Sequence, residues 1–378
     1  MKKIAFSGTL DPITNGHLWV IGEARALAEE VVVFVSENPF KKPLFSAAQR
    51  KTIVEQTLAQ HGWRDVKVVI VRGDYTARAA KRQGIDYLIR GIRNTSDFDY
   101  ENLLQQANVD VVEGAKTLFV MPPRDLGSVS STFVRGLQGP VGWHWSMQKF
   151  VPGPAYEAWI LGWLRKEWEQ LWNYPALSEA AVANADDWFA HLSGEKAYGA
   201  PNRRYHNRDH LVHGLTELTV WGANADADKP SVATVKAAFW FHDAVYEVPK
   251  KGTTNEEASA QLWLASGLPA ANPAEVADMI RVTDHAQRQA LDHPLKNVIL
   301  GADLAILGQS EAIYKTYTQS IRDEYAWVDA QSYRSGRKAV LQHFLAAAKS
   351  GDLYVDTYFK DLYEASAVRN LECEIDAL

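Results

Sequence analysis

The chain has 378 residues, of which 47% are hydrophobic and 23% charged, and its formal net charge is −6 at pH 7. This length allows two domains with separate cores, whereas the negative charge gives no support to a nucleic-acid binder. The single cysteine, Cys373, excludes an internal disulfide and a cysteine-rich zinc site.

The first half of the chain alternates short buried strands with helical patterns. Strands are predicted over residues 3–6, 31–35, 66–71, 87–89 and 117–120. Helical patterns follow His17 and begin again near Ala47, Thr76 and Phe98. This alternation predicts an α/β Rossmann-like domain with a parallel sheet over residues 1–162, in which ligands bind at the carboxyl ends of the strands.

The segment FSGTLDPITNGHLWVI, residues 6–21, combines the first strand, a turn and the start of a helix. The first N–H groups of a helix lack internal partners and carry partial positive charge, so phosphates bind there readily. Thr9, Thr14, Gly16 and His17 would surround such a phosphate. From this segment alone, an ordinary turn with a surface histidine is an equal alternative.

Three further segments follow predicted strands and add charged or hydroxyl side chains. Residues 38–45 contain Lys41, residues 88–101 contain Arg90, Arg93 and Glu101, and residues 129–135 contain a run of hydroxyl side chains. The carboxyl ends of parallel strands meet at one edge of a sheet. Two arginines, a lysine, a histidine and a hydroxyl-rich helix start at this edge favour a polyphosphate ligand.

Residues 1–162 closely resemble the phosphopantetheine adenylyltransferases, which belong to the nucleotidyltransferase superfamily marked by (H/T)xGH, here Thr14-Asn15-Gly16-His17. The resemblance implies adenylyl transfer from ATP, with Mg²⁺, to a phosphorylated acceptor such as 4′-phosphopantetheine, with release of pyrophosphate. It makes His17, Lys41 and Arg90 catalytic, and His17 would stabilise the pentacovalent transition state. The implied nucleotide contacts are Thr9, Leu10, Gly16, His17, Gly91, Arg93, Glu101, Ser130, Ser131 and Thr132. The implied acceptor contacts are Thr9, Lys41, Thr76 and Arg90.

The sequence departs from this family where the pantetheine arm should bind. An apolar residue is expected where Thr76 stands, and a Met-Asn-Arg-like run where Ala107-Asn108-Val109 stands. We therefore expect nucleotidyl transfer, with 4′-phosphopantetheine a poor acceptor or not the best one. A cytidylyl- or nicotinamide-type transferase is the alternative, because those relatives share the same signature.

From about residue 155 onward strand patterns nearly vanish, which predicts an all-α second domain over residues 163–378. Helices are expected over residues 155–172, 180–192, 210–221, 232–241, 255–265, 311–327 and 337–348.

Histidines and aspartates with metal-ligand character lie in this second domain. His206 and His210 are four residues apart, the pair His242-Asp243 ends an apolar helix, and Asp303 stands alone in an apolar run. Imidazole and carboxylate ligands together suit Mn, Fe, Co, Ni, Zn or Mg. Each piece alone is better explained as a core histidine or a capping aspartate, but the ordered set favours a divalent metal.

Residues 163–378 resemble the HD-domain metal-dependent phosphohydrolases. The resemblance implies that His210, His242, Asp243 and Asp303 are the metal ligands. It also implies that His206 is catalytic and protonates the leaving oxygen. Glu247, Asn255, Glu256 and His285 are further pocket candidates, for which surface or supporting roles are the favoured alternative.

The two resemblances together predict a bifunctional enzyme in which both domains act on related phosphorylated metabolites. The alternative makes the HD domain a nucleotide-sensing regulatory module. The expected partners are a small nucleotide and a phosphorylated acceptor, and neither a nucleic acid nor a membrane is expected. The sequence is compatible with a homo-oligomer. The apolar stretch after Lys2 and Lys3 is too short for a signal-peptide core, and no apolar run reaches roughly 18 residues, so we expect a cytoplasmic protein.

Overall fold

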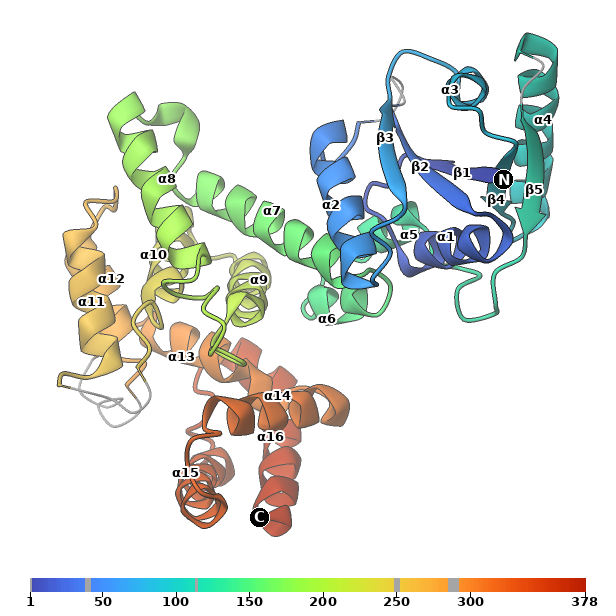
Figure 1. Ribbon diagram of the computed structural model, residues 1–378. Helices are drawn as coiled ribbons and strands as arrows, with labels where there is room; N and C mark the ends of the chain where they lie inside the picture. Colours follow the sequence, from blue (N-terminus) through green and yellow to red (C-terminus); the bar gives the residue numbers. More distant parts are fainter. Residues whose placement is uncertain (1, 38–41, 113–114, 248–251, 285–291) are drawn as a thin grey trace. The chain divides into compact units, whose positions relative to one another are not determined.

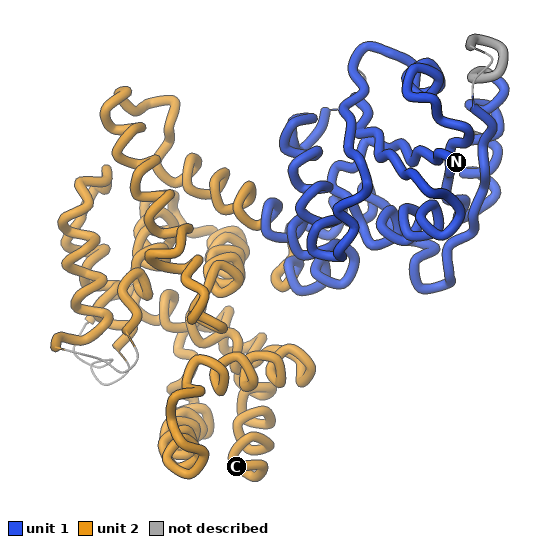
Figure 2. Tube along the Cα trace, in the orientation of Figure 1, with its two compact units in different colours: residues 1–139, 143–159 blue, residues 140–142, 160–378 orange. Residues whose placement is uncertain are grey.

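The computed structural model describes residues 2–37, 42–112, 115–247, 252–284 and 292–378, and for residues 100 and 107–112 it describes the backbone alone. The chain forms two compact units (Figure 2). Unit 1 contains residues 1–139 and 143–159, and unit 2 contains residues 140–142 and 160–378. The main boundary between the units falls within helix α7, Gly153–Leu171.

Unit 1 is built on a five-stranded, entirely parallel sheet with strand order β3-β2-β1-β4-β5 (Figure 1). The strands are β1 Lys3–Gly8, β2 Glu30–Ser36, β3 Lys67–Val71, β4 Tyr87–Gly91 and β5 Lys116–Val120. The helices are α1 Asn15–Leu27, α2 Ala47–Gln60, α3 Thr76–Arg82, α4 Thr95–Val112, α5 Ser131–Gly136 and α6 Trp143–Gln148. The predicted parallel α/β architecture and all five predicted strands are confirmed.

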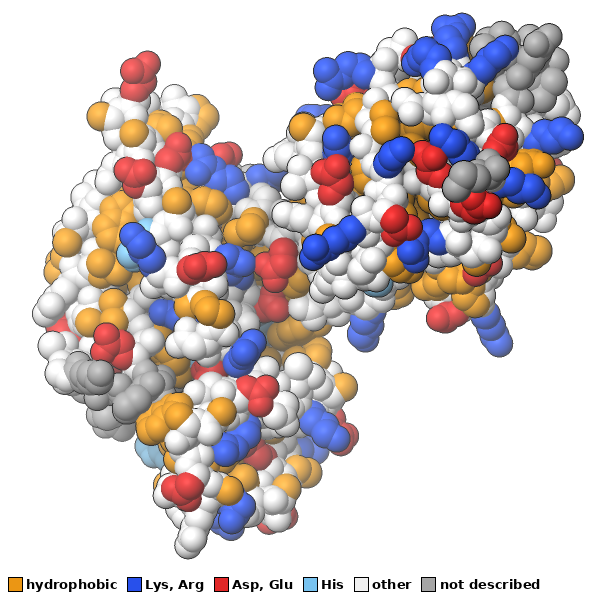
Figure 3. Space-filling model, in the orientation of Figure 1, with side chains coloured by type: hydrophobic (Ala, Val, Ile, Leu, Met, Phe, Trp, Pro, Cys, Tyr) orange, Lys and Arg blue, Asp and Glu red, His pale blue; other side chains and the backbone are white. Residues whose placement is uncertain are grey.

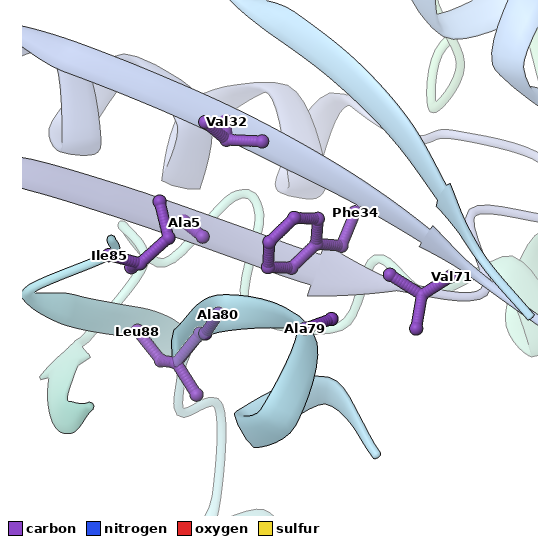
Figure 4. Close-up of a cluster of buried hydrophobic side chains, with 8 residues drawn as sticks. All are labelled: Ala5, Val32, Phe34, Val71, Ala79, Ala80, Ile85 and Leu88. Atoms are coloured by element: carbon purple, nitrogen blue, oxygen red, sulfur yellow. The ribbon is translucent and has the colours of Figure 1, made fainter. Parts of the chain in front are cut away.

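One face of the sheet packs against α3 through small and branched apolar side chains (Figure 4). Ala5 in β1 lies in register with Val32 in β2 and Leu88 in β4, and Phe34 lies two residues further along β2. Ala80 of α3 completes this fully buried layer. Because side chains alternate along a strand, the next position of β1 on this face is Ser7, at the end where ligands bind.

The strand order places β1 between β2 and β4, and this arrangement positions the site. The chain passes from β1 to β2 on one side, and later crosses to β4 on the other side. Connections that leave in opposite directions open a crevice at the carboxyl ends of the two strands. The segments after β1 and β4 therefore flank one crevice.

Unit 2 is helical, as predicted. After the second part of α7 it contains α8 Glu179–Ser193, α9 Arg208–Asn224, α10 Lys229–Phe241, α11 Asn255–Ala265, α12 Pro273–Arg281, α13 Lys296–Leu304, α14 Glu311–Glu324, α15 Ala330–Ser350 and α16 Thr357–Ala377, with short 3₁₀ turns at Tyr174–Ala176 and Ala305–Gly308. Within this unit the fully buried Trp168 contacts the rings of Trp172, Phe189 and Trp240.

Three helices of unit 2 were not predicted, and α9, α10, α14 and α15 each have one end that differs from the predicted bound by three residues or more. Helix α13 was missed because it is buried nearly all round, which removes the period of an amphipathic helix. Helices α12 and α16 were also missed. Helix α14 ends at Glu324 instead of residue 327, and α15 begins at Ala330 instead of residue 337.

No helix in the described part of the chain is long and apolar enough to cross a membrane. On the face of the molecule in Figure 3, basic and acidic side chains are interspersed in both units.

Candidate functional site

A cavity of about 280 Å³ opens at the carboxyl ends of β1 and β4 in unit 1. Most of the predicted nucleotide and acceptor residues line it: Thr9, Leu10, Gly16, His17, Arg90, Gly91, Arg93, Glu101, Ser130, Ser131 and Thr132. Thr76 is not part of this lining, and Lys41 lies outside the described residues.

His17 occupies the third position of helix α1 and closes a capping box with Thr14. The Thr14 side chain accepts a hydrogen bond from the His17 backbone N–H, and His17 Nδ1 accepts one from the Thr14 backbone N–H at 3.0 Å. An Nδ1 that accepts a hydrogen bond carries no proton, so the neutral ring has its N–H at Nε2. Burial and the nearby Arg93 charge lower the pKa of His17 to about 4, so the ring is neutral near pH 7.

Gly16 lets the segment before α5 approach the start of α1. A Cβ atom at Gly16 would lie 3.3 Å from the carbonyl oxygen of Val129 and 3.7 Å from Thr14 Oγ1. Ser131 also ties the two segments together, because its hydroxyl donates to the Pro12 carbonyl at 2.8 Å. A larger residue at position 16 would push these segments apart and widen the cavity.

Arg90 and Arg93 supply the positive charge of the cavity. Arg90 pairs with Glu101 at 3.2 Å and donates to the carbonyl of Ser7 at the end of β1. Arg93 forms a two-point ion pair with Asp97 at 2.7 and 3.2 Å. Because both guanidinium groups are held by these partners, they are already oriented at the cavity before an anion binds.

Asp11 and Arg50 fix the loops around the cavity, and neither was predicted as a site residue. The Asp11 carboxylate is 2% exposed and accepts from the backbone N–H groups of Leu44 at 2.7 Å and Phe45 at 3.0 Å. It also pairs with Arg135 at 2.9 Å. Arg50 is equally buried and donates to carbonyl oxygens of Thr9, Ser36 and Phe45. In the sequence, the only feature that pointed to either role was the turn pair Asp11-Pro12.

Thr76 lies next to a small cluster of hydroxyl groups at the ends of β1 and β2. Ser7 Oγ is 2.9 Å from Ser36 Oγ and 3.4 Å from Thr76 Oγ1. The structure thus places Thr76 beside the β1 end of the site, in a polar environment. The side chains of Ala107, Asn108 and Val109 lie outside the described residues.

In unit 2 the predicted metal ligands converge from three helices. His210 in α9, His242 after α10 and Asp303 in α13 place their ligand atoms within 4.8 Å of one another. The two Nε2 atoms are 3.0 Å apart, and each lies 3.5 Å from Asp303 Oδ1. Asp243 Oδ2 lies 3.1 Å from His242 Nε2 and 3.6 Å from His210 Nε2.

These separations fit the ligand shell of a divalent metal. With metal–ligand bonds of about 2.1 Å, neighbouring ligand atoms are about 3.0 Å apart in an octahedron and about 3.4 Å apart in a tetrahedron. His242 Nδ1 donates to the Phe239 carbonyl at 2.8 Å, which leaves Nε2 free to face a metal, as in many histidine ligands.

The protonation of the two histidines is consistent with a cation site. Burial and the neighbouring His242 lower the pKa of His210 to about 3, so its imidazole is neutral and able to bind a metal. Burial opposes a charge on His242, but the carboxylates of Asp243 and Asp303 raise its pKa well above the usual value. A divalent cation would replace that proton and balance the same carboxylates.

His206 lies in the same cavity and has a partner that sequence reasoning missed. Its Nδ1 is 2.7 Å from Glu324 Oε2, and its ring stacks on Tyr246 with centroids 4.1 Å apart. The other oxygen of Glu324 accepts the backbone N–H groups of Tyr205 and His206. Burial disfavours the protonated ring, but the charges of Glu324 and Asp243 raise the pKa of His206 overall.

The remaining pocket candidates differ in their roles. Glu247, Asn255 and Glu256 line the cavity of about 650 Å³ that contains His206, His242 and Asp303. The Asn255 side chain exchanges two hydrogen bonds with the Glu247 backbone, at 3.1 and 3.3 Å, which is a supporting role. His285 lies outside the described residues.

Comparisons with known proteins concern the first unit. A family model described as cytidylyltransferase-like matches residues 5–137. The phosphopantetheine adenylyltransferase of Chromobacterium violaceum is 38% identical over 156 residues, which cover 41% of this chain and 94% of that protein. Its counterpart in Histophilus somni is 39% identical over 137 residues, covering 36% of this chain and 85% of the relative. That of Lacticaseibacillus paracasei is 35% identical over 158 residues, covering 42% and 92%.

These relatives are matched over nearly their whole length by unit 1, where the signature Thr14-Asn15-Gly16-His17 borders a cavity lined by Arg90 and Arg93. Through this unit the chain belongs to the phosphopantetheine adenylyltransferase family.

Proposed function

We propose that unit 1 transfers the adenylyl group of ATP to a phosphorylated acceptor, either 4′-phosphopantetheine or a related metabolite, and releases pyrophosphate. The proposal is supported chiefly by the position and the protonation of His17. A neutral His17, with its N–H at Nε2, lies in the same cavity as Arg90 and Arg93 at the carboxyl ends of β1 and β4.

The transfer needs positioning and charge neutralisation more than covalent catalysis. An oxygen of the acceptor phosphate attacks the α-phosphorus of ATP, and the bond to the pyrophosphate oxygen breaks. His17 Nε2–H and the N-terminus of α1 stabilise the negative charge that grows on the α-phosphate oxygens. Arg90 and Arg93, with Lys41 by family resemblance, hold the remaining phosphates.

Magnesium fits this site best as an ion carried by the nucleotide. The two carboxylates that line the cavity, Asp11 and Glu101, are already paired with Arg135 and Arg90. Mg²⁺ keeps several waters and is commonly bound through substrate phosphates, where it neutralises their charge.

A pyrophosphate-release assay on the full chain tests this function. ATP and CTP are each combined with 4′-phosphopantetheine, nicotinamide mononucleotide and a panel of small phosphate esters, and products are identified by mass. We expect release with ATP and one phosphorylated acceptor. Release with CTP alone, or with nicotinamide mononucleotide alone, would support the alternative transferase types.

For unit 2 we propose a metal-dependent phosphohydrolase, and the converging ligand atoms of His210, His242 and Asp303, with Asp243 beside them, support it. A bound divalent metal (Mn, Fe, Co, Ni, Zn or Mg) would lower the pKa of a ligand water and supply hydroxide near neutral pH. His206, protonated and held by Glu324, would give its proton to the leaving oxygen.

Metal analysis and hydrolysis assays test the second function. The full chain is stripped with a chelator, reloaded with each candidate metal, and assayed with p-nitrophenyl and bis-p-nitrophenyl phosphate. We expect stoichiometric metal and metal-dependent hydrolysis. Metal binding without hydrolysis of any phosphate compound, together with a nucleotide effect on unit 1 that Asp243→Ala removes, would favour a sensing module instead.

A further inference from the structure

The cavity of unit 2 extends well beyond the residues that would hold a metal and a phosphoryl group. Its volume of about 650 Å³ is lined on the side of α14 and α15 by aliphatic and aromatic side chains. Ile321, Trp327, Tyr333, Val340 and Phe344 belong to this lining, which we call the apolar arm. A phosphoryl group alone needs only a small part of such a volume.

The apolar arm offers flat surfaces suited to a ring. The rings of Tyr325 and Trp327 are nearly parallel, with centroids 6.4 Å apart and an interplanar angle of 25°. Trp327 is 56% exposed and Val340 47% exposed, although both are large apolar side chains at the cavity. Exposed apolar groups at the mouth of a pocket mark ligand-binding surfaces, and aromatic side chains there bind planar groups well.

The charges of the arm do not suit a second phosphate. Arg337 is the one arginine or lysine among the described lining residues, and it is buried. It is bound by the Glu374 carboxylate at 2.8 and 3.1 Å, and it donates to the Tyr317 hydroxyl at 3.3 Å. Polyphosphates are bound by several cations, and the described lining offers one arginine and no lysine, which favours an uncharged group in the arm.

We propose that the substrate of unit 2 is a phosphate ester of an uncharged alcohol that carries an aromatic or large apolar group, which binds in the apolar arm. This inference rests on the proposed hydrolase function. Water adds its oxygen to phosphorus, the ester P–O bond breaks with its electron pair going to the alcohol oxygen, and His206 supplies the proton to that oxygen. The products are the free alcohol and the phosphate.

Matched substrates test the proposal on the metal-loaded full chain. Ethyl phosphate and 2-(1-naphthyl)ethyl phosphate have leaving alcohols of similar acidity, so they differ mainly in the group offered to the arm. Each is assayed as the monoester and as its methyl diester. We expect kcat/KM to be higher for the naphthyl compound by on the order of tenfold or more, chiefly through KM.

Variants at the arm provide the second measurement. Trp327→Ala and Val340→Ala should move the naphthyl-to-ethyl ratio of kcat/KM toward one. Leu362→Ala in α16 removes a side chain that is 53% exposed and does not line the cavity, so it should keep the ratio of the parent chain. Binding of 2-(1-naphthyl)ethanol to the metal-free chain, followed by calorimetry, should weaken in Trp327→Ala and stay unchanged in Leu362→Ala.

Failure of the apolar-arm assignment and failure of the hydrolase function give different results in these assays. Hydrolysis of ethyl phosphate at the same efficiency as the naphthyl ester would overturn the assignment of the arm while leaving the hydrolase standing. Absence of hydrolysis of every ester by the metal-loaded chain would overturn the hydrolase function, and the substrate assignment with it.

Discussion

His17 Nδ1 accepts a hydrogen bond from the backbone N–H of Thr14 at 3.0 Å, while the Thr14 side chain accepts one from the His17 backbone. The first of these two reciprocal hydrogen bonds fixes the tautomer and the orientation of the ring, and together they cap helix α1. A histidine held in this way has one donor left, at Nε2. The four residues of the signature thus combine helix capping with the N–H donor that we propose for phosphate binding.

Replacing His17 by alanine should remove transition-state stabilisation of on the order of 2.7 to 4 kcal/mol, the usual loss for one preorganised donor. The rate of pyrophosphate release should fall accordingly, with a smaller effect on the KM for ATP. His61→Ala, which removes an exposed histidine of the same unit, is the matched control. Unchanged pyrophosphate release in His17→Ala would remove this residue from the mechanism.

The pKa of His17 predicts how unit 1 responds to acid. The folded value of about 4 lies below the ordinary 6.5, so between these values the unfolded chain binds a proton that the folded chain does not. The contribution of His17 to the free energy of unfolding should therefore fall as the pH drops from 6.5 toward 4, and should be constant above 6.5.

Nitrogen NMR of the histidine rings measures this directly. The His17 ring should stay neutral, with its proton at Nε2, from pH 8 to pH 5. If His17 titrates near 6.5, or carries its proton at Nδ1, then the capping box does not determine the protonation and the tautomer of this ring.

The elements of unit 1 could be predicted because their signals are local. A buried strand such as residues 31–35 and a signature such as Thr14-Asn15-Gly16-His17 are each contained in a few consecutive residues. Asp11 and Arg50 could not be assigned, because their partners at Leu44 and Thr9 lie 33 and 41 residues away. Whether such a residue helps to hold the cavity together depends on which loops the folded sheet brings next to it.

The same limit applies to unit 2. The ligand types and their order along the chain predicted which histidines and aspartates the fold would bring together. Glu324, however, is 118 residues from His206 and lies at the end of a helix whose sequence gives no sign of a buried carboxylate. The apolar arm was missed for a related reason, since its aromatic side chains look like ordinary core residues in the sequence.

The threonine at position 76 leads us to expect an acceptor preference that differs from that of the family. Its hydroxyl lies beside Ser7, where the family resemblance calls for an apolar residue against the pantetheine arm. We expect 4′-phosphopantetheine to be outperformed by a more polar phosphorylated acceptor, because a hydroxyl stands where the family has an apolar contact to the pantetheine arm.

Thr76→Leu should lower the KM for 4′-phosphopantetheine by about fivefold to tenfold, which corresponds to roughly 1 to 1.4 kcal/mol and to the lower end of the range for a methylene-sized contact. Thr52→Leu, on the exposed side of α2, is the matched control. If 4′-phosphopantetheine wins a competition among acceptors in the parent chain, this expectation is wrong.

Asp243→Ala tests whether the two chemistries are separate. The substitution removes a carboxylate that lies 3.1 Å from His242 Nε2 and 3.6 Å from His210 Nε2, the two proposed histidine ligands, so bound metal should decrease and hydrolysis should be lost. Pyrophosphate release by unit 1 should stay nearly intact, because each unit has its own core and its own cavity.

Asp361→Ala, which removes an exposed carboxylate of α16, is the control for this experiment. Unaffected metal content and hydrolysis in Asp243→Ala would show that the metal assignment is wrong. Loss of both activities together would show that the two sites do not act independently.

In the proposed reaction, unit 1 breaks ATP between its α- and β-phosphates and joins the α-phosphate to an acceptor. The most direct measurement follows the label from [α-³²P]ATP and [γ-³²P]ATP with the full chain and its best acceptor. We predict that the α-label enters the acceptor product and the γ-label enters pyrophosphate. Transfer of the γ-label to the acceptor, or an acceptor product without the α-label, would contradict adenylyl transfer at the His17 site.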